Sequence, residues 1–413
     1  MRGVRILIAV IFLVGLVVAQ AKRDAGGRFA ITGGTVFTMA GPPITSGVVL
    51  VKDKKIEKVG AADQVAVPEG YTVIDAKGHW VVPGFVELHN HTLGTDLHDN
   101  VFQVNPELRV LDNVQMEGPA SRIAVAGGVT SALIIPGSGS NMGGFGVIVK
   151  TAGRHPKDVV VKFPGALKIA QAGNPEQYDG DLGHTVMGMN WMIRNVLSEG
   201  KAYHEAWNAF EKGKTKIEPD RDPRYEYMRG LFRGEYPCAV HTQQVQVVQS
   251  SMRILHDELG LKMVVDHGTF DGYLNAPEIA KRSIPVANGP RQFWYDRRQG
   301  RMIGLTAAWY WLGVGDDRIG INTDSPGVPQ EELFYQGTWS IRMGLPESVA
   351  LRALTINAAR MLMVADRLGS LEPGKDADIA IWTGDPFDPR SRTQVVLVSG
   401  KVAYDADRDG IRF

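Results

Sequence analysis

Two histidines one residue apart follow a short apolar run in the segment VVPGFVELHNHTLG, residues 81–94. In an extended strand, residues i and i+2 point to the same side, so His89 and His91 face one point while Asn90 faces away from it. Two imidazoles that converge in this way can hold a metal ion. The simpler explanation is a pair of polar residues at the end of a strand, and the rest of the chain distinguishes between these interpretations.

Further side chains of the metal-binding type follow apolar runs later in the chain. His241 follows YPCAV, His267 follows KMVVD and Asp324 follows RIGINT, so each is expected at the end of a strand. One histidine in such a place is more often a hydrogen-bonded core residue, but five ligand-type residues at matching strand ends rarely arise by chance. The chain has a single cysteine, Cys238. The ligands are therefore imidazole nitrogen and carboxylate oxygen, which suit Zn²⁺ and similar divalent ions.

The elements that must position these residues fall into two groups. Short β-type runs separated by turn residues occupy 28–82 and again 369–413, which predicts a small β-sandwich domain formed by the N- and C-terminal segments. Over 83–368, short apolar strands alternate with longer helical stretches such as 190–213 and 346–362. This alternation predicts an α/β fold, a (β/α)8 TIM barrel, in which functional side chains gather at the carboxyl ends of the strands.

The first 21 residues have the pattern of a signal peptide. A positively charged start precedes an apolar run over 6–18, which is shorter than the about 20 residues that a membrane span needs, and the residues at 19–21 fit a cleavage site. We expect the mature protein to begin near Lys22 and to be exported to the periplasm or outside the cell. An uncleaved N-terminal anchor is the alternative.

The overall composition excludes one class of partner. Among 413 residues, 45 Lys and Arg balance 45 Asp and Glu, so the chain has no global basic field of the kind that nucleic-acid-binding proteins carry. Hydrophobic residues make up 44% and charged residues 22%, as in ordinary globular proteins. We expect a small-molecule substrate and no stable membrane span after signal cleavage, and the sequence is compatible with an oligomer.

Several segments resemble the amidohydrolase superfamily. VVPGFVELHNHT is similar to the family's Pro-Gly-Phe-x-x-x-His-x-His first strand, and INTDSPG is similar to its eighth-strand Thr-Asp. LTINAARMLMVADRLGSLEPGKDADIAIW is similar to its closing helix and its return into the β domain, while IIPGSGSNMGGFGVIVKT and LKIAQAGNPE resemble the imidazolonepropionase-like branch. The resemblance spans residues 28–405 and implies a metal-dependent hydrolase of carbon–nitrogen bonds.

The resemblance also implies a set of metal ligands. They are His89, His91, Lys168, His241, His267 and Asp324. The first two histidines and Asp324 would hold the more buried ion, and the later two histidines would hold a second ion or complete a single-metal site. Lys168 is the candidate for a carboxylated lysine, because a carbamate is an anion that can bridge two cations. A lysine at a strand end that faces solvent is the alternative for this position.

The expected reaction uses Asp324 and His267 as its catalytic residues. A bound divalent ion, most simply Zn²⁺, lowers the pKa of water toward about 7 and supplies hydroxide. Asp324 would take the proton during attack and deliver it to the leaving nitrogen, as general base and then general acid. In a single-metal site His267 would orient the water or stabilise the oxyanion. Gln243, Asn288 and Arg291 are candidate substrate-binding residues, the last because its planar fork suits a carboxylate.

Departures from the branch leave the substrate open. Residues 172–175 read Ala-Gly-Asn-Pro where relatives have Gly-Glu-Asn-Pro, and residues 241–243 read His-Thr-Gln where relatives have His-Ala-His. The glycine-rich segment 137–144 lacks the ending of a phosphate loop and is expected to be a flexible rim loop. Two alternatives remain: a single-metal aminohydrolase that deaminates a ring amidine without a bridging lysine, and a non-catalytic exported binding protein.

Overall fold

The computed structural model describes residues 27–94, 97–116, 118–171, 173–176 and 182–412. The chain forms two compact units, one made of Met1–Gly84 with Ser370–Phe413 and the other of Phe85–Gly369. The signal peptide expected over residues 1–21 lies outside the described residues and stays a prediction. None of the described helices combines the length and the apolar character that crossing a membrane requires.

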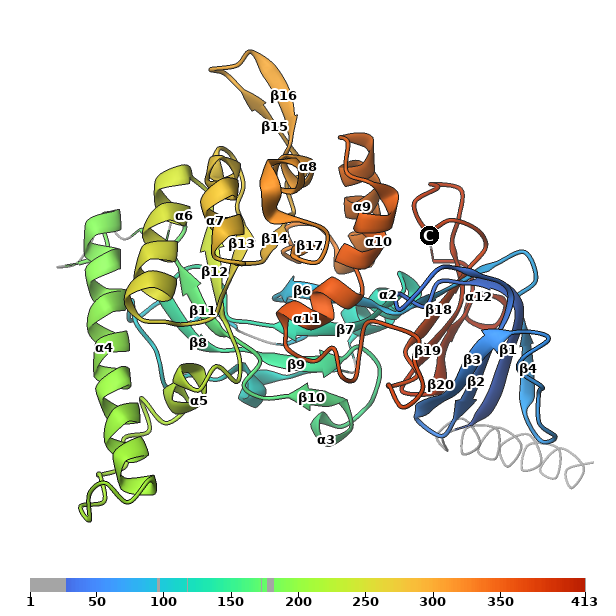
Figure 1. The fold of residues 1–413 in the computed structure, drawn as a ribbon, viewed down its shortest axis with the longest axis horizontal. Coiled ribbons are helices and arrows are strands. Elements are labelled where there is room, and N and C mark those ends of the chain that lie inside the picture. Colours follow the sequence, from blue (N-terminus) through green and yellow to red (C-terminus); the bar gives the residue numbers. More distant parts are fainter. Residues whose placement is uncertain (1–26, 95–96, 117, 172, 177–181, 413) are drawn as a thin grey trace, which may run out of the picture. The chain divides into compact units, whose positions relative to one another are not determined.

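The first unit is built on one hydrogen-bonded sheet with the strand order β20-β19-β18-β5-β1-β2-β3 and β4 beside β1 (Figure 1). Its strands are β1 (Arg28–Val36), β2 (Ile44–Lys52), β3 (Lys55–Ala61), β4 (Thr72–Asp75), β5 (Trp80–Pro83), β18 (Ile379–Trp382), β19 (Thr393–Val398) and β20 (Lys401–Asp405). The antiparallel pair β5–β18 joins the two ends of the chain. One core cluster contains both Ile56 of β3 and Leu397 of β19. Pairing thus links all these strands into one sheet, and the two-sheet sandwich stays a prediction.

The second unit has a TIM-barrel-like fold of mixed α/β content. Its parallel strands are β6 (Phe85–Asn90), β7 (Val129–Ile134), β11 (Leu167–Ala170), β12 (Cys238–Thr242), β13 (Met263–His267), β14 (Val286–Asn288) and β17 (Ile319–Ile321). Parallel pairs join β6 to β7 and run from β11 through β12, β13 and β14 to β17. A parallel bridge between Asn90 and Ser325 brings the end of β6 to the segment after β17.

Two strands of this unit run antiparallel to their neighbours. The apolar run at 146–151 does form a strand, β9 (Val147–Lys150), but it pairs antiparallel with β7, and β8 (Met142–Phe145) pairs antiparallel with β11. A parallel partner would need a crossover of a dozen or more residues, usually through a helix. The segment between β7 and β9 contains β8 and no helix, so the chain returns antiparallel. The expectation of uninterrupted βα units is wrong here, and full (β/α)8 closure stays a prediction.

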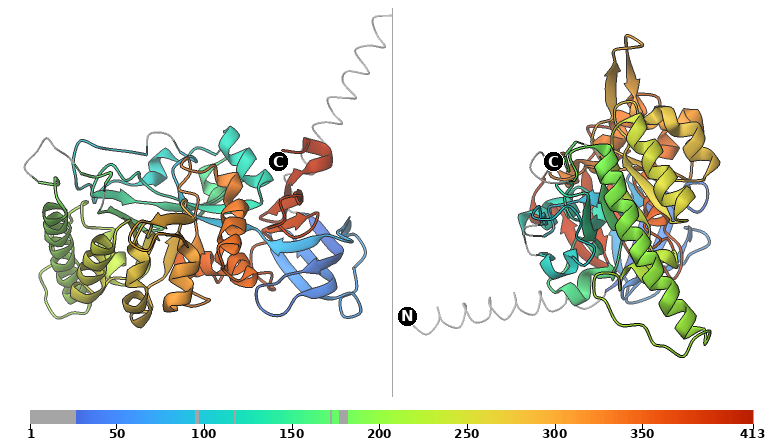
Figure 2. Two further views of the ribbon diagram at one scale, coloured as in Figure 1. Left: turned by 90° about the horizontal axis from the view of Figure 1, so that it is seen from above. Right: turned by 90° about the vertical axis from the view of Figure 1, so that its left-hand side faces the viewer.

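The helices of the second unit follow the strands (Figures 1 and 2). They are α2 (Pro119–Ala126), α3 (Pro156–Val159), α4 (Val186–Glu211), α5 (Met228–Phe232), α6 (Val245–Ser251), α7 (Ala276–Lys281), α8 (Leu305–Trp309), α9 (Leu333–Arg342), α10 (Glu347–Ala353) and α11 (Ile356–Met361). The helix expected at 346–362 is divided into α10 and α11, because Thr355 has non-helical angles. A hairpin of β15 (Phe293–Asp296) and β16 (Arg301–Gly304) projects from this unit (Figure 1).

The core explains which face of β6 carries the polar residues. Val86 and Leu88 belong to a buried apolar cluster that also contains Ala358 and Met361 of α11. Successive side chains of a strand point to opposite faces. Glu87 and His89 therefore face the other side, where the carboxyl ends of the neighbouring strands meet.

Candidate metal-binding active site

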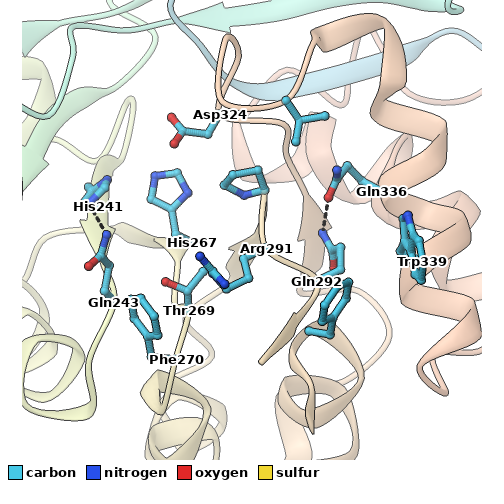
Figure 3. Close-up of a pocket in the computed structure, with 13 residues that line it drawn as sticks. His241, Gln243, His267, Thr269, Phe270, Arg291, Gln292, Asp324, Gln336 and Trp339 are labelled. Atoms are coloured by element: carbon cyan, nitrogen blue, oxygen red, sulfur yellow. Dashed lines mark hydrogen bonds between the residues drawn. The ribbon is translucent and has the colours of Figure 1, made fainter. Parts of the chain in front are cut away.

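Three of the expected ligands come together at the carboxyl ends of the strands. His89, His267 and Asp324 each offer one ligand atom, and these atoms all lie within 4.8 Å of one another. They come from β6, from β13 and from the turn after β17, which are far apart in the sequence. Figure 3 shows His267 and Asp324 together with His241 at the cavity. The strand-end rule therefore predicted the place where these residues meet.

His89 is fully buried and contacts a group on each side of its ring. Its Nδ1 lies 3.0 Å from Oδ2 of Asp266, and its Nε2 lies 2.8 Å from Nζ of Lys168. Burial holds the pKa of His89 well below its usual value, so the ring is neutral. A neutral ring that donates Nδ1–H to Asp266 has a lone pair on Nε2, which here accepts from Nζ of Lys168 and which a metal ion would take. The sequence interpretation missed Asp266, which fixes this tautomer.

Lys168, on β11, is also fully buried, so the alternative of a solvent-facing lysine is wrong. Burial lowers the pKa of its ammonium group. Asp266 contacts the other side of the His89 ring, and burial raises the pKa of its carboxyl group. A buried lysine loses its proton more easily than an exposed one. The neutral amine that results is the form that reacts with carbon dioxide.

His267 carries the clearest sign of a missing partner. Its Nδ1–H donates to the carbonyl oxygen of Gly289 at 2.7 Å, and burial lowers its pKa to about 4. Its Nε2 is buried and has no hydrogen-bond partner among the described residues. Buried polar atoms are almost always satisfied, so an isolated lone pair in this position calls for a ligand. The ring centroid lies 4.5 Å from those of His89 and His241.

Asp324 presents its carboxylate to two of these rings. Its Oδ1 lies 3.5 Å from Nε2 of His89 and 3.3 Å from Nε2 of His91. The Nδ1–H of His91 donates to the carbonyl oxygen of Ile135 at 2.8 Å, because this oxygen can only accept, and this bond directs Nε2 of the ring toward Asp324. Imidazole nitrogens and a carboxylate oxygen that converge in this way are the donors that a divalent ion takes in proteins. The donor set therefore fits a divalent metal ion.

The charge state of Asp324 agrees with this arrangement. Burial alone would raise its pKa, but the interactions with His267, Lys168 and His91, the last including a hydrogen bond, outweigh burial and hold the pKa well below the usual range. The backbone φ is 49° at Asp324 and 67° at His267, both in the left-handed region that non-glycine residues rarely adopt. Strain of this kind is concentrated at functional sites, where it fixes the direction of a side chain.

His241, on β12, contacts the glycine-rich segment 137–144, in which the sequence had indicated no site residue. Its Nδ1 lies 3.0 Å from Oγ of Ser138, and its Nε2 lies 3.4 Å from Nε2 of Gln243. Burial lowers the pKa of His241 well below its usual value. Ser138 is itself buried, 6% exposed, so this part of the glycine-rich segment supports the site and is not a flexible rim.

Glu87 connects the first and last strands at the site. Its carboxylate accepts hydrogen bonds from the backbone N–H of His89 at 2.9 Å, and from the backbone N–H and hydroxyl of Thr323 at 3.2 and 2.7 Å. Full burial raises its pKa to about 7. The sequence interpretation missed Glu87, although its i+2 spacing from His89 on the same face of β6 could have indicated it.

A cavity of about 420 Å³ opens onto this cluster (Figure 3). It is lined by His241, Gln243, His267, Thr269, Phe270, Pro290, Arg291, Gln292, Phe293, Asp324, Val328, Gln336 and Trp339. Of the residues expected to bind substrate, Gln243 and Arg291 line it. Asn288 does not, because it is fully buried, donates to the His267 carbonyl oxygen at 2.5 Å and accepts from the Thr306 hydroxyl at 2.7 Å. Asn288 therefore holds the backbone of His267.

Comparisons with known proteins show which family the chain resembles. The sequence profile described as "Amidohydrolase family" matches residues 310–404. The crystal structure of an amidohydrolase from Thermotoga maritima superposes with a TM-score of 0.81 at 30% identity, covering 91% of this chain and 100% of that one.

Two curated sequences extend the likeness. Imidazolonepropionase of Sphingopyxis alaskensis is 23% identical over 86% of this chain and 92% of its own length. Amidohydrolase tasK of Hapsidospora irregularis is 25% identical over 87% of this chain, which spans only 40% of tasK. The likeness to the Thermotoga maritima amidohydrolase over the full length of that protein assigns the family. The chain belongs to the amidohydrolase superfamily and is a hydrolase that acts on carbon–nitrogen bonds.

Proposed function

We propose that this chain hydrolyses an amide, a cyclic amide or a dipeptide bond with one or two divalent metal ions, most simply Zn²⁺. The observation that supports this best is the buried Nε2 of His267, which has no partner among the described residues and faces the site shared with His89 and Asp324. Imidazole nitrogen and carboxylate oxygen are the ligands that zinc takes in hydrolytic sites.

The proposed ligand set has two parts. His89, His91 and Asp324 would hold one ion, and His241 and His267 would hold a second ion or complete a single site. Lys168 would join them as a carbamate. Its burial, its lowered pKa and the 2.8 Å distance from its Nζ to Nε2 of His89 support this assignment.

The chemistry of the step depends on Asp324. A bound ion would activate water at neutral pH and polarise the substrate carbonyl. The lowered pKa of Asp324 keeps it anionic, so it can accept the proton of the attacking water. The same carboxyl group would then deliver this proton to the leaving nitrogen, which is a poor leaving group as an amide anion. With 28% of its side chain exposed, Asp324 stays in contact with the cavity where the substrate would lie.

The metal content and a substrate screen test the proposal together. The protein should be loaded with zinc and assayed on N-acyl amino acids, dipeptides and cyclic ureides, with ammonia release measured in parallel. Asp324→Asn should reduce hydrolysis by about 10² to 10⁴-fold while the far-UV circular dichroism stays unchanged. Release of ammonia from a ring amidine, with no hydrolysis of amides, would favour the aminohydrolase instead. Unchanged hydrolysis in Asp324→Asn would contradict the role of this residue.

We also propose that the chain is exported. The charged start, the apolar run over 6–18 and the small residues at 19–21 support a signal peptide. Mass spectrometry of the N-terminus of protein purified from its native host tests this, and a mature start near Lys22 is expected.

A further inference from the structure

The cavity at the metal-binding cluster has an uneven distribution of charge. Among the described residues that line it, Arg291 carries the only guanidinium or ammonium group and Asp324 the only carboxylate. Asp324 faces the histidine cluster, as its distances to His89 and His91 show. Arg291 therefore supplies a positive charge to the cavity that the Asp324 carboxylate does not neutralise.

Arg291 is placed to bind an anion from the cavity. Its guanidinium carbon lies 5.5 Å from the centre of the Phe270 ring. Among the described residues no carboxylate lies within 4 Å of it, whereas Arg298 in the following hairpin pairs with Asp271 at 2.8 Å. A guanidinium that rests its face on an aromatic ring keeps its in-plane N–H groups available. Two of these N–H groups match the two oxygens of a carboxylate.

Arg291 lies close in the chain to a residue that orients His267. Gly289 accepts the hydrogen bond from Nδ1 of His267, and Arg291 follows it by two residues. Pro290 between them also lines the cavity. His267, Asp324 and Arg291 line the same cavity, so one small substrate can place its scissile bond at the cluster and an anionic group at Arg291.

The remaining wall of the cavity is aromatic. Phe293 and Trp339 lie with their ring centroids 5.5 Å apart, and 40% and 44% of their surfaces are exposed. Large apolar side chains exposed in a cavity gain free energy when an apolar ligand group covers them. This wall suits an apolar or aromatic substituent on the substrate.

We propose that the substrate carries, besides the scissile carbon–nitrogen bond, a free carboxylate that is bound by Arg291 and an apolar substituent that packs on Phe293 and Trp339. An N-acyl aromatic amino acid, or a dipeptide with a free C-terminus, has this chemistry. The inference rests on the proposed hydrolysis of amide-type bonds and names the substrate class for it.

Binding of two matched probes tests the inference without turnover. N-methanesulfonyl-phenylalanine and N-methanesulfonyl-2-phenylethylamine differ only in the carboxylate, and their sulfonamide bonds resist hydrolysis. Isothermal titration of the zinc-loaded protein should give about 10- to 100-fold tighter binding for the acid. Arg291→Met should remove this preference, and Arg291→Lys should keep only part of it. Arg297→Met changes an exposed arginine that does not line the cavity and should leave the preference intact.

The outcomes separate this inference from the proposed function. Equal affinity for the two probes, no measurable binding of the acid, or a preference that survives Arg291→Met would overturn the inference, even if amide hydrolysis is found. A preference that is lost in Arg291→Met supports the inference. If the wild-type protein shows this preference but hydrolyses no amide, dipeptide or cyclic ureide, the proposed function fails while the carboxylate subsite stands.

Discussion

The Nζ of Lys168 lies 2.8 Å from Nε2 of His89, and both side chains are fully buried although they are 79 positions apart in the chain. Because burial lowers the pKa of the lysine, its amine is available to react with carbon dioxide. We predict that zinc-loaded protein supplied with carbon-13 bicarbonate shows a carbamate signal by nuclear magnetic resonance. Lys168→Met should abolish the signal and reduce the bound metal.

A second lysine controls for non-specific labelling in that experiment. Lys162 is half-buried, and its Nζ donates to the carbonyl oxygen of Glu235 at 2.7 Å, away from the histidine cluster. Lys162→Met should keep the carbamate signal. A signal that persists in Lys168→Met, or that disappears in Lys162→Met, would remove the assignment to Lys168.

Glu87 should stabilise the fold through its link between β6 and the end of β17. In Glu87→Gln the amide nitrogen replaces an oxygen that accepts hydrogen bonds from Thr323, so two donors face each other in a buried place. The loss should be about 1–3 kcal/mol in the free energy of unfolding. Urea denaturation of the metal-free protein measures it. Glu278→Gln, an exposed residue paired with Lys281, should change stability by less than about 0.5 kcal/mol. Equal changes in both variants would contradict the role of Glu87.

Ser138 should position His241 for metal binding. If Nδ1–H of His241 donates to Oγ of Ser138, the hydroxyl sets the orientation of the ring, and Nε2 keeps a lone pair that contacts the Gln243 amide here and that an ion would take. Ser138→Ala should weaken zinc affinity by about 10- to 100-fold, measured by competition with a chelating dye. Ser140→Ala changes a neighbouring serine that is also buried and should leave the affinity unchanged. An affinity that is the same in Ser138→Ala and wild type would show that the contact does not orient the ligand.

Cys238 should be inert in the folded protein. It is fully buried on β12, and burial raises the pKa of its thiol well above the usual value, so the reactive thiolate is scarce at neutral pH. A thiol-specific chromogenic reagent at pH 8 should label no cysteine in the native protein and one per chain in concentrated denaturant. Rapid labelling of the native protein would show that β12 is not packed as described.

The sequence predicted the site residues whose position depends only on the strand that carries them. His89, His91, His241, His267 and Asp324 each follow an apolar run, and parallel strands bring their carboxyl ends to one edge. Local pattern was sufficient for these five because neither the strand order nor the loops had to be known.

The missed residues depend on contacts between distant segments. Asp266 precedes His267, so strand alternation alone would turn it away, but the positive φ at His267 ends the extended conformation there. Ser138 lies in a glycine-rich segment whose spacing matches no ligand pattern. The antiparallel course of β9 was also missed, although the short segment after β7, without a helix, indicated it.

The central claim is that the imidazoles and Asp324 hold a metal ion, and zinc content measured by mass spectrometry after dialysis tests it most directly. Wild-type protein loaded with zinc should retain at least one ion per chain. His267→Gln should lose most of it. His256→Gln, which changes a surface histidine paired with Asp257, should retain as much zinc as wild type. Folded wild-type protein that retains no zinc, manganese, cobalt or iron, or His267→Gln that retains as much as wild type, would contradict the account.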